Sequence, residues 1–203
     1  MSEQTIFVVD DDEAVLDALS ITLDTVGLPF KAYLSAQAFL DDYHNEPGCL
    51  VLDIRMPNMS GVELQQHLID HGALLPIIFV TGHGDIPLAV ETMRKGAVDF
   101  IRKPYDDEEL LSSIREALAR NASARSQQES QEASQRRIDS LSPREKEVFV
   151  RVASGQANKV VAIELKISER TVEIHRSQVM RKTGCRTLTD LVRLEIAANT
   201  PSQ

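Results

Sequence analysis

Cys49-Leu50-Val51-Leu52-Asp53 is the most apolar run of the chain, and it ends in a carboxylate. Three other apolar runs also end at reactive or charged side chains, and the four ends together carry Asp10, Asp11, Asp53, Thr81 and Lys103. In an open parallel sheet the carboxyl ends of the strands share one edge, where ligands bind. These side chains are therefore expected to meet in one pocket, which could bind a small hard cation and accept a phosphoryl group.

The first 120 residues alternate between short apolar runs and amphipathic segments. After the first run, Leu16, Leu19 and Leu23 recur three and four residues apart, as one face of a helix requires. Four further helices are expected, one of them from about Ser60 to His71 and the other three with N-caps at Ser35, Asp85 and Asp106. Five strands each followed by a helix predict an α/β fold over residues 1–120, a flavodoxin-like (βα)5 domain with strand order 2-1-3-4-5.

Composition and charge favour two globular domains. The 203 residues are 42% hydrophobic and 26% charged, and they include two cysteines, too few for a disulfide framework. The start of the chain has no basic region before a long apolar stretch, and no run approaches the ~20 apolar residues of a membrane helix, so a cytoplasmic protein without a membrane partner is expected. Residues 1–120 carry a net charge of −13 and residues 121–203 carry +4, which suggests an acidic module joined to one that meets a polyanion.

Residues 121–140 consist almost wholly of Ala, Ser, Arg, Gln and Glu. Most of these are good helix formers, so a polar helical linker is predicted, with disorder as the alternative because little apolar surface is available for burial. Residues 141–203 predict an all-α domain of four helices, which begins with Ser142 as N-cap before Pro143. Short helices over about 158–165 and 169–183, with a tight joint between them, are typical of a helix-turn-helix.

Most residues of the expected pocket have a plain structural alternative. Mg²⁺ would offset the repulsion between Asp10 and Asp11, although the pair could equally be an acidic helix N-terminus. Asp53 could act as a nucleophile toward phosphorus. Thr81 could donate a hydrogen bond to a phosphoryl oxygen, or it could simply belong to a turn at the end of the strand. Lys103 could neutralise the charge of the phosphoryl group, or it could be an ordinary surface lysine. The bond between Lys103 and Pro104 is a candidate for the cis form.

Four motifs give a resemblance that covers nearly the whole chain. They are Val9-Asp10-Asp11-Asp12, Leu52-Asp53-Ile54-Arg55-Met56-Pro57 followed by Ser60-Gly61, Thr81-Gly82-His83-Gly84, and Lys103-Pro104-Tyr105. With these motifs the chain resembles two-component response regulators of the FixJ/NarL group. The resemblance implies that a sensor histidine kinase phosphorylates Asp53, and that Asp10, Asp11 and Asp53 hold Mg²⁺ with the Arg55 backbone carbonyl. It also implies that Thr81 and Phe100 form a switch pair and that Lys103 contacts the phosphoryl group.

The C-terminal residues resemble the LuxR-type output domain of the same group. The matching stretches are Leu141-Ser142-Pro143-Arg144-Glu145-Lys146-Glu147-Val148, Asn158-Lys159 and Ile167-Ser168-Glu169-Arg170-Thr171-Val172-Glu173-Ile174-His175. The resemblance implies a transcriptional regulator that binds double-stranded DNA, forms a homodimer on phosphorylation and contacts RNA polymerase. It implies no enzyme beyond self-catalysed phosphotransfer and slow autodephosphorylation.

The spacing within the recognition helix separates core residues from candidate DNA contacts. Val172, Val179 and Thr183 recur at helical spacing and should face the core. Glu173, Ile174 and Ser177 then point outward and are candidates for reading bases. The alternative for Glu173 is an exposed helical charge without a role in binding. Candidates for contacting phosphates are Lys159, Arg170, Arg176, Arg181 and Lys182. The resemblance implies a dimer surface over about residues 87–115. The last helix, with Leu188, Leu191 and Val192, is a candidate for a second dimer surface.

Two other functions compete with this interpretation. A phosphatase of the haloacid-dehalogenase type would need a second Asp two residues after Asp53, and Arg55 stands there instead. A phosphorylation-independent adaptor would not need the basic residues clustered over 170–182. His67 and His71 have a spacing that could chelate a metal, but no third ligand is evident, so both are expected to face solvent.

Overall fold

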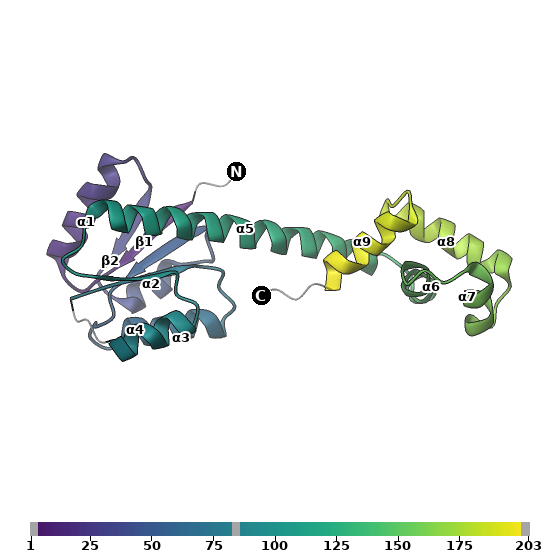
Figure 1. The fold of residues 1–203 in the computed structure, drawn as a ribbon, viewed down its shortest axis with the longest axis horizontal. Helices are drawn as coiled ribbons and strands as arrows, with labels where there is room; N and C mark the ends of the chain where they lie inside the picture. The colour runs from purple at the N-terminus through teal and green to yellow at the C-terminus, as the bar shows by residue number, and fades with distance from the viewer. Residues whose placement is uncertain (1–3, 83–85, 200–203) are drawn as a thin grey trace. The chain divides into compact units, whose positions relative to one another are not determined.

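Five parallel strands form one sheet in the order β2-β1-β3-β4-β5 in the computed structural model, which describes residues 4–82 and 86–199 (Figure 1). The strands are β1 (Thr5–Val9), β2 (Phe30–Tyr33), β3 (Gly48–Leu52), β4 (Ile77–Thr81) and β5 (Asp99–Arg102). This confirms the flavodoxin-like order expected from the sequence. β3 and β4 are buried along their whole length, as strands covered on both faces must be.

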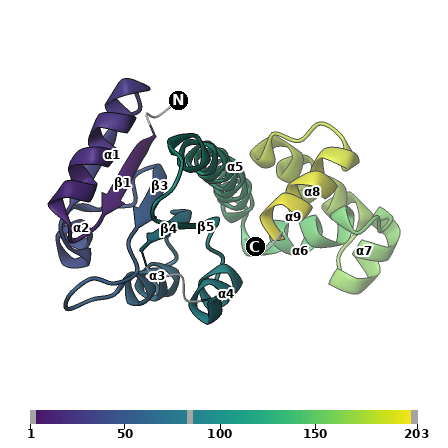
Figure 2. The ribbon, with the colours of Figure 1, turned by 60° about the vertical axis from the view of Figure 1, so that its left-hand side comes forward.

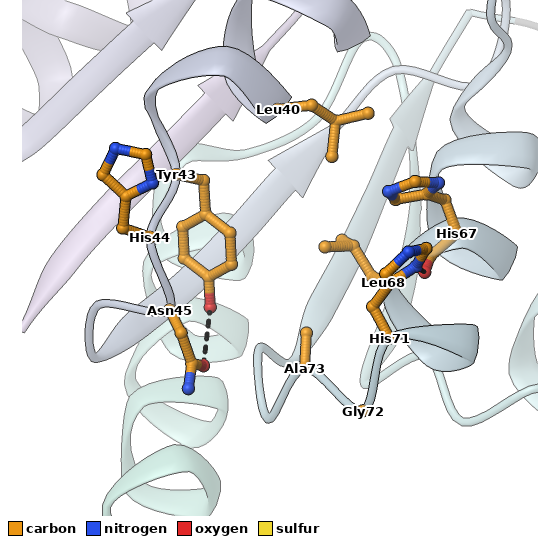
Figure 3. A pocket seen from close by; sticks show the side chains of 9 residues that line it. All are labelled: Leu40, Tyr43, His44, Asn45, His67, Leu68, His71, Gly72 and Ala73. Atoms are coloured by element: carbon orange, nitrogen blue, oxygen red, sulfur yellow. Dashed lines mark hydrogen bonds between the residues drawn. The ribbon is translucent and has the colours of Figure 1, made fainter.

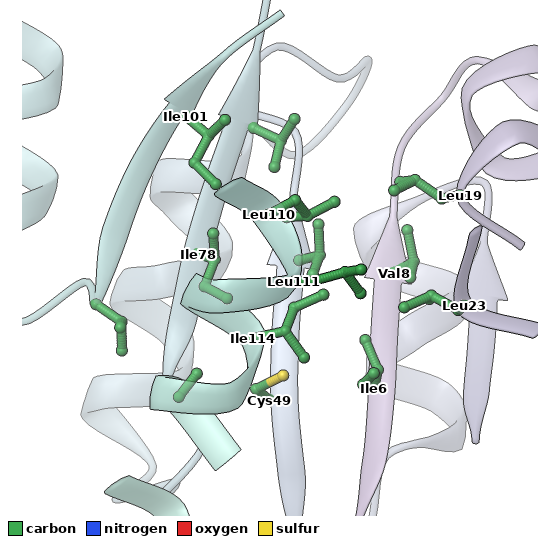
Figure 4. Close-up of a cluster of buried hydrophobic side chains, with 14 of the residues drawn as sticks. Ile6, Val8, Leu19, Leu23, Cys49, Ile78, Ile101, Leu110, Leu111 and Ile114 are labelled. Atoms are coloured by element: carbon green, nitrogen blue, oxygen red, sulfur yellow. The ribbon is translucent and has the colours of Figure 1, made fainter. Parts of the chain in front are cut away.

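Helices cover both faces of this sheet (Figures 1 and 2). They are α1 (Glu13–Thr25), α2 (Ala36–Asp42), α3 (Gly61–Asp70), α4 (Ile86–Arg94) and α5 (Asp107–Asp139). On one face Leu19 and Leu23 of α1 and Leu110 of α5 pack with the strand residues drawn in Figure 4. On the other face Phe39 of α2 and Leu64 of α3 form a second core.

Capping residues fix where the helices begin. Asp12 accepts from the Ala14 N–H at the start of α1, and Ser35 accepts from the Ala38 N–H at the start of α2. Ser60 and Glu63 form a reciprocal capping box on α3. The Asp106 carboxylate accepts from the Glu108 N–H at the start of α5. The expected cap Asp85 and the motif residues His83 and Gly84 lie outside the described residues.

The predicted polar linker is helical, because α5 continues without interruption to Asp139. The chain divides into two compact units, Met1–Arg125 and Ser126–Gln203, and α5 contributes to both. Within the N-terminal unit, Asn121 is fully buried and accepts from the Gly48 N–H over 3.0 Å. One turn later, Arg125 donates to the Asn45 carbonyl over 2.7 Å. Across residues 4–82 and 86–199, the structure contains no helix with the length and apolar character to cross a membrane.

The C-terminal unit is helical, as expected. Beyond the end of α5 it consists of α6 (Pro143–Ala153), α7 (Asn158–Leu165), α8 (Glu169–Thr183) and α9 (Leu188–Asn199). Its core includes Val148 and Phe149 of α6 and Val172 of α8. Leu191 of α9 is fully buried in this core, so the prediction that it forms part of a dimer surface was wrong. The burial follows from its place on the inner face of α9, three residues before buried Leu194.

Candidate functional site

Asp10 and Asp53 lie side by side at the carboxyl edge of the sheet. The last residues of β1 and β3, Val9 and Leu52, are register partners, so each aspartate is one step beyond a paired position. The Asp53 N–H donates to the Val9 carbonyl over 2.9 Å and extends this pairing. Both side chains are buried, with 4% of Asp10 and 8% of Asp53 exposed, so their charges need partners within the protein.

Lys103 supplies that partner. Its Nζ lies 2.5 Å from Asp10 Oδ2 and 3.3 Å from Asp53 Oδ1. The backbone places it there, because the Lys103 N–H donates to the Thr81 carbonyl over 2.8 Å and continues the pairing of β4 with β5. The peptide bond to Pro104 is cis, which confirms the form considered from the sequence. Lys103 is therefore no plain surface lysine.

The surroundings of this cluster raise the pKa of Asp53 and the pKa of Lys103, for different reasons. Burial raises the pKa of Asp53 above its ordinary value, and the nearby Asp10 adds to the rise, while Lys103 and the Arg55 N–H oppose it. Burial alone would lower the pKa of Lys103, but its bonds to Asp10 and Asp53 outweigh burial and raise that pKa. The ammonium stays charged and holds two buried carboxylates.

The other predicted residues of the pocket surround this cluster to different degrees. Thr81 is buried at the end of β4, while Phe100 is half-buried on β5 and packs against the second core. The Arg55 N–H donates to Asp53 Oδ2 over 2.6 Å, and the Arg55 side chain is exposed. Asp11 is exposed beside Asp10. The helix cap is Asp12, so the alternative role of an N-cap does not apply to Asp10.

The donor chemistry at this edge fits a hard cation. Asp10, Asp11 and Asp53 offer carboxylate oxygens, which Mg²⁺ prefers as ligands. Within the described parts of the chain, no three or more His, Cys, Asp or Glu side chains are grouped closely enough to hold an ion. In this structure Lys103 neutralises the carboxylates that an ion would otherwise bind.

Gly61 is a further residue of the site that the sequence analysis quoted but gave no role. A Cβ at this position would lie 2.2 Å from the Asp53 carbonyl oxygen, far inside any contact distance. The Gly61 N–H donates to the Ile54 carbonyl over 2.9 Å, which holds the start of α3 against the loop after Asp53. Only glycine allows this approach. The signal was the glycine directly after the Ser60 cap.

A second candidate surface lies on α8 in the C-terminal unit. Val172, Val179 and Thr183 are buried, as expected from their spacing. A hollow of about 460 Å³ on the outer side is lined by Arg170, Glu173, Ile174, Ser177 and Gln178. It includes the three residues predicted to read bases, all of them exposed, and Gln178, which the sequence analysis missed. Gln178 follows Ile174 by four residues, a helical spacing that could have indicated it.

The predicted phosphate-contacting residues differ in their surroundings. Lys159, Arg170 and Arg181 are exposed, and Arg181 donates to Gln178 Oε1 over 2.8 Å. Arg176 is half-buried and donates to Asn158 Oδ1 over 3.1 Å, which ties α8 to the start of α7. Lys182 Nζ lies 2.7 Å from Oε2 of the buried Glu145 on α6. This bond and the Ser142 N–H lower the pKa of Glu145 to about 2.

A pocket elsewhere in the N-terminal unit contains three histidines (Figure 3). Its volume is about 350 Å³, and Tyr43, His44, His67 and His71 line it. The His67 and His71 rings stack with centroids 4.0 Å apart, and His71 Nδ1 is 2.7 Å from the His67 carbonyl. His71 is exposed as expected, whereas His67 is half-buried. The pocket contains neither Asp10 nor Asp53 and is distinct from the aspartate cluster.

Comparison with known proteins matches both units to characterised families. The profile described as response regulator receiver domain matches residues 6–115, and the profile described as bacterial regulatory proteins, luxR family, matches residues 139–195. Response regulator protein TodT of Pseudomonas putida is 46% identical over 190 residues, covering 93% of this chain and 84% of that protein. Transcriptional regulatory protein FixJ of Azorhizobium caulinodans is 43% identical over 194 residues, covering 95% of this chain and 92% of that protein.

A solved structure agrees with this match. The response regulator StyR superposes with a TM-score of 0.86 at 40% identity, covering 96% of this chain and 98% of that one. The receiver profile covers the aspartate cluster, and the luxR profile covers the exposed face of α8. Both units thus belong to families that act together in signalling, with a sensor kinase and DNA as partners. The chain belongs to the FixJ/TodT family of two-component response regulators, which are transcription regulators with a receiver domain and a LuxR-type DNA-binding domain.

Proposed function

We propose that Asp53 is the residue that a sensor histidine kinase phosphorylates. The observation that carries this proposal is the placement of a buried carboxylate, 8% exposed, with its Oδ1 3.3 Å from the Lys103 ammonium. An oxygen of Asp53 attacks phosphorus while the P–N bond of the donor phosphohistidine breaks. The product is an acyl phosphate with about −1.5 to −2 charges, which Lys103 can neutralise in part.

Mg²⁺ is the proposed cofactor of this transfer. Asp10, Asp11, Asp53 and the backbone carbonyl of Arg55 would hold it. A bound divalent cation neutralises charge on the phosphoryl oxygens. With the repulsion between Asp10 and Asp53 offset in this way, the Lys103 ammonium would be available to the phosphoryl group.

Thr81 and Phe100 are the proposed switch. Thr81 ends β4 and Phe100 lies on the neighbouring β5. In the phosphorylated state the Thr81 hydroxyl would move toward the phosphoryl group and the Phe100 ring would turn inward. Contacts made only to the phosphorylated form are what shift a population between two states. We propose that this shift promotes a homodimer through residues 87–115, together with Leu188 and Val192 of α9.

The proposed output is DNA binding by the exposed face of α8, in the cytoplasm and with RNA polymerase as a further partner. Glu173, Ile174 and Ser177 would reach base edges in the major groove. The phosphate contacts would come from Lys159, Arg170, Arg176, Arg181 and Lys182. The proposed division of labour is a receiver domain over 1–120, a linker over 121–140 and a DNA-binding domain over 141–203.

Intact-mass spectrometry after incubation with acetyl phosphate and Mg²⁺ tests the phosphoacceptor assignment. We expect a single phosphate adduct in the wild type and none in Asp53→Asn. Asp70→Asn is the matched control, because Asp70 is an exposed aspartate at the end of α3 and should leave the adduct intact. An adduct that persists in Asp53→Asn would show that another residue accepts the phosphoryl group.

A further inference from the structure

Arg137, near the C-terminal end of α5, contacts the last residue of the recognition helix. Its Nε donates to the Thr183 carbonyl over 2.6 Å, and its Nη2 donates to the same oxygen. Nη2 also lies 3.6 Å from Cys185 Sγ. All of these residues belong to the C-terminal unit, although Arg137 precedes the luxR profile, which begins at residue 139.

The Thr183 carbonyl is an acceptor that the helix itself cannot satisfy. The last four carbonyls of an α-helix have no partner within it, and they form the negative end of the helix dipole. A guanidinium at this end supplies both hydrogen bonds and a positive charge. Gly184, the C-cap of α8, has φ of +69°, and a Cβ there would lie 3.7 Å from Arg137 Nη2. The guanidinium therefore lies directly over the turn that ends α8.

Other residues of α5 hold this part of the helix on the C-terminal unit. Ile138 packs against the core that contains Val172 and Val179 of α8. Gln131 Nε2 lies 3.5 Å from the Ala198 carbonyl, near the end of α9. The last turns of α5 thus contact the C-terminal ends of both α8 and α9, with Arg137 making the charged contact.

We propose that Arg137 is a positioning residue for sequence-specific DNA binding, which sets the orientation of the recognition helix from its C-terminal end. The inference rests on the proposed role of α8 in reading bases. Because the outer face of α8 carries the candidate contacts and its inner face is packed, a small tilt of the helix axis displaces Glu173 and Ile174 together. The contact between Arg137 and the Thr183 carbonyl fixes the end of α8 to the last turns of α5, and so limits this tilt.

The test compares two neighbouring arginines in the full-length protein. Arg137→Ala removes the contact with Thr183, whereas Arg136→Ala removes an exposed arginine whose carboxylate partner, Glu132, lies 3.4 Å away on the same helix. A duplex selected by the wild-type protein from a random pool serves as the specific probe, and a scrambled duplex of equal length serves as the non-specific probe. Affinities for both are measured over a range of salt concentrations.

If Arg137 positions α8, its substitution should reduce affinity for the selected duplex and leave affinity for the scrambled duplex unchanged. We expect Arg137→Ala to weaken binding to the selected duplex by about tenfold, the effect of losing roughly one charge-assisted hydrogen bond. Affinity for the scrambled duplex and the salt slope should stay unchanged, and Arg136→Ala should match the wild type in all respects. Amide exchange at residues 183–187 should accelerate in Arg137→Ala only, because the cap of α8 is lost.

Two results would overturn the proposal. In the first, Arg137→Ala binds the selected duplex as tightly as Arg136→Ala does. In the second, it loses affinity for both duplexes and the salt slope falls by about 0.9, as expected if Arg137 contacts a DNA phosphate directly. A wild-type protein that binds no duplex even after phosphorylation with acetyl phosphate and Mg²⁺ would instead contradict the proposed DNA-reading role of α8.

Arg137→Lys keeps the test decisive if the alanine variant unfolds. Arg137 lines an open pocket of about 320 Å³ together with Gly184 and Cys185 and is not part of the packed core, so the fold should survive the substitutions. Lysine keeps the charge but cannot place two N–H groups in a fixed fork on one oxygen. We expect a partial loss, about threefold, of specific affinity only. Wild-type affinity together with wild-type amide exchange in Arg137→Lys would contradict the proposal.

Discussion

Lys103 Nζ lies 2.5 Å from Asp10 Oδ2, across the carboxyl edge of the sheet. The same ammonium is 3.3 Å from Asp53 Oδ1, so one positive charge is shared by two buried carboxylates. A phosphoryl group on Asp53 adds negative charge to a site that is already acidic, and a cation that binds the aspartates changes what Lys103 must neutralise. The Lys103 ammonium and a bound cation would therefore compete for the same carboxylates, and some of the predictions for the N-terminal unit follow from this competition.

Replacing Lys103 by Gln should make the stability of the N-terminal unit depend on Mg²⁺. Without the ammonium, two buried carboxylates repel each other, and we expect a loss of about 2 kcal/mol, less than for a fully buried pair because 22% of the Lys103 side chain is exposed. Millimolar Mg²⁺ should restore most of this loss, because a divalent cation neutralises the same oxygens. Thermal unfolding with and without Mg²⁺ measures both effects.

Lys95→Gln is the control for this experiment. Lys95 pairs with Glu91 over 2.9 Å at the surface, where an ion pair contributes about 0–1 kcal/mol. Equal losses in the two variants, or an equal response to Mg²⁺ in Lys103→Gln and wild type, would contradict the shared-charge account.

Asp53→Asn should stabilise the unphosphorylated protein at neutral pH. Burial raises the pKa of Asp53 above 3.8, so the folded state binds a proton more readily than the unfolded state. The stability of the fold therefore falls as pH rises from 3.8 through the pKa of the folded state. Asparagine removes this penalty, and we expect the melting temperature at pH 7 to rise by about 2–4 °C, the shift for roughly 1 kcal/mol in a chain of this size. The gain should vanish below pH 3.8, where the carboxyl is protonated in both states. A lower melting temperature at pH 7 would contradict this prediction.

Gly61→Ala should displace the backbone at Asp53. The new Cβ would meet the Asp53 carbonyl oxygen at 2.2 Å, so the loop or the start of α3 must shift. We expect a loss of more than about 2 kcal/mol in stability, as is typical of overpacking, together with slower adduct formation with acetyl phosphate. Gly82→Ala is the control, because nothing lies within 4 Å of a Cβ there. Similar melting temperatures for the two variants would show that the site tolerates the methyl group.

Glu145→Gln should remove a pH dependence from the C-terminal unit. The Lys182 bond and the Ser142 N–H lower the pKa of Glu145 from 4.5 to about 2. A group whose pKa is lower in the folded state stabilises the fold above 4.5, and this contribution is lost as pH falls toward 2. The variant should therefore melt lower at pH 7 and vary less between those two values. Glu147→Gln, an exposed change on the same helix, should keep the wild-type profile.

The sequence predicted most of the fold because local signals agreed with one another. The apolar runs before Asp10 and Asp53 placed the strands, and Ser142 forms the capping box with Glu145 that the sequence suggested. What it could not give were contacts between distant segments. The pairing of Arg137 with Thr183 joins residues 46 apart and leaves no periodic pattern. Leu191 was placed on the wrong face because a four-helix pattern alone does not tell which leucines of the last helix face the core.

Measuring DNA affinity before and after phosphorylation tests the central claim, that Asp53 controls the output of the chain. The wild-type protein is incubated with acetyl phosphate and Mg²⁺, its adduct is verified by intact mass, and its binding to the selected duplex is titrated beside that of Asp53→Asn. We predict tighter binding for the phosphorylated wild type only, with a steeper concentration dependence as the homodimer forms. Equal affinities for the phosphorylated and unphosphorylated wild type would contradict the account, because DNA binding would then be independent of Asp53.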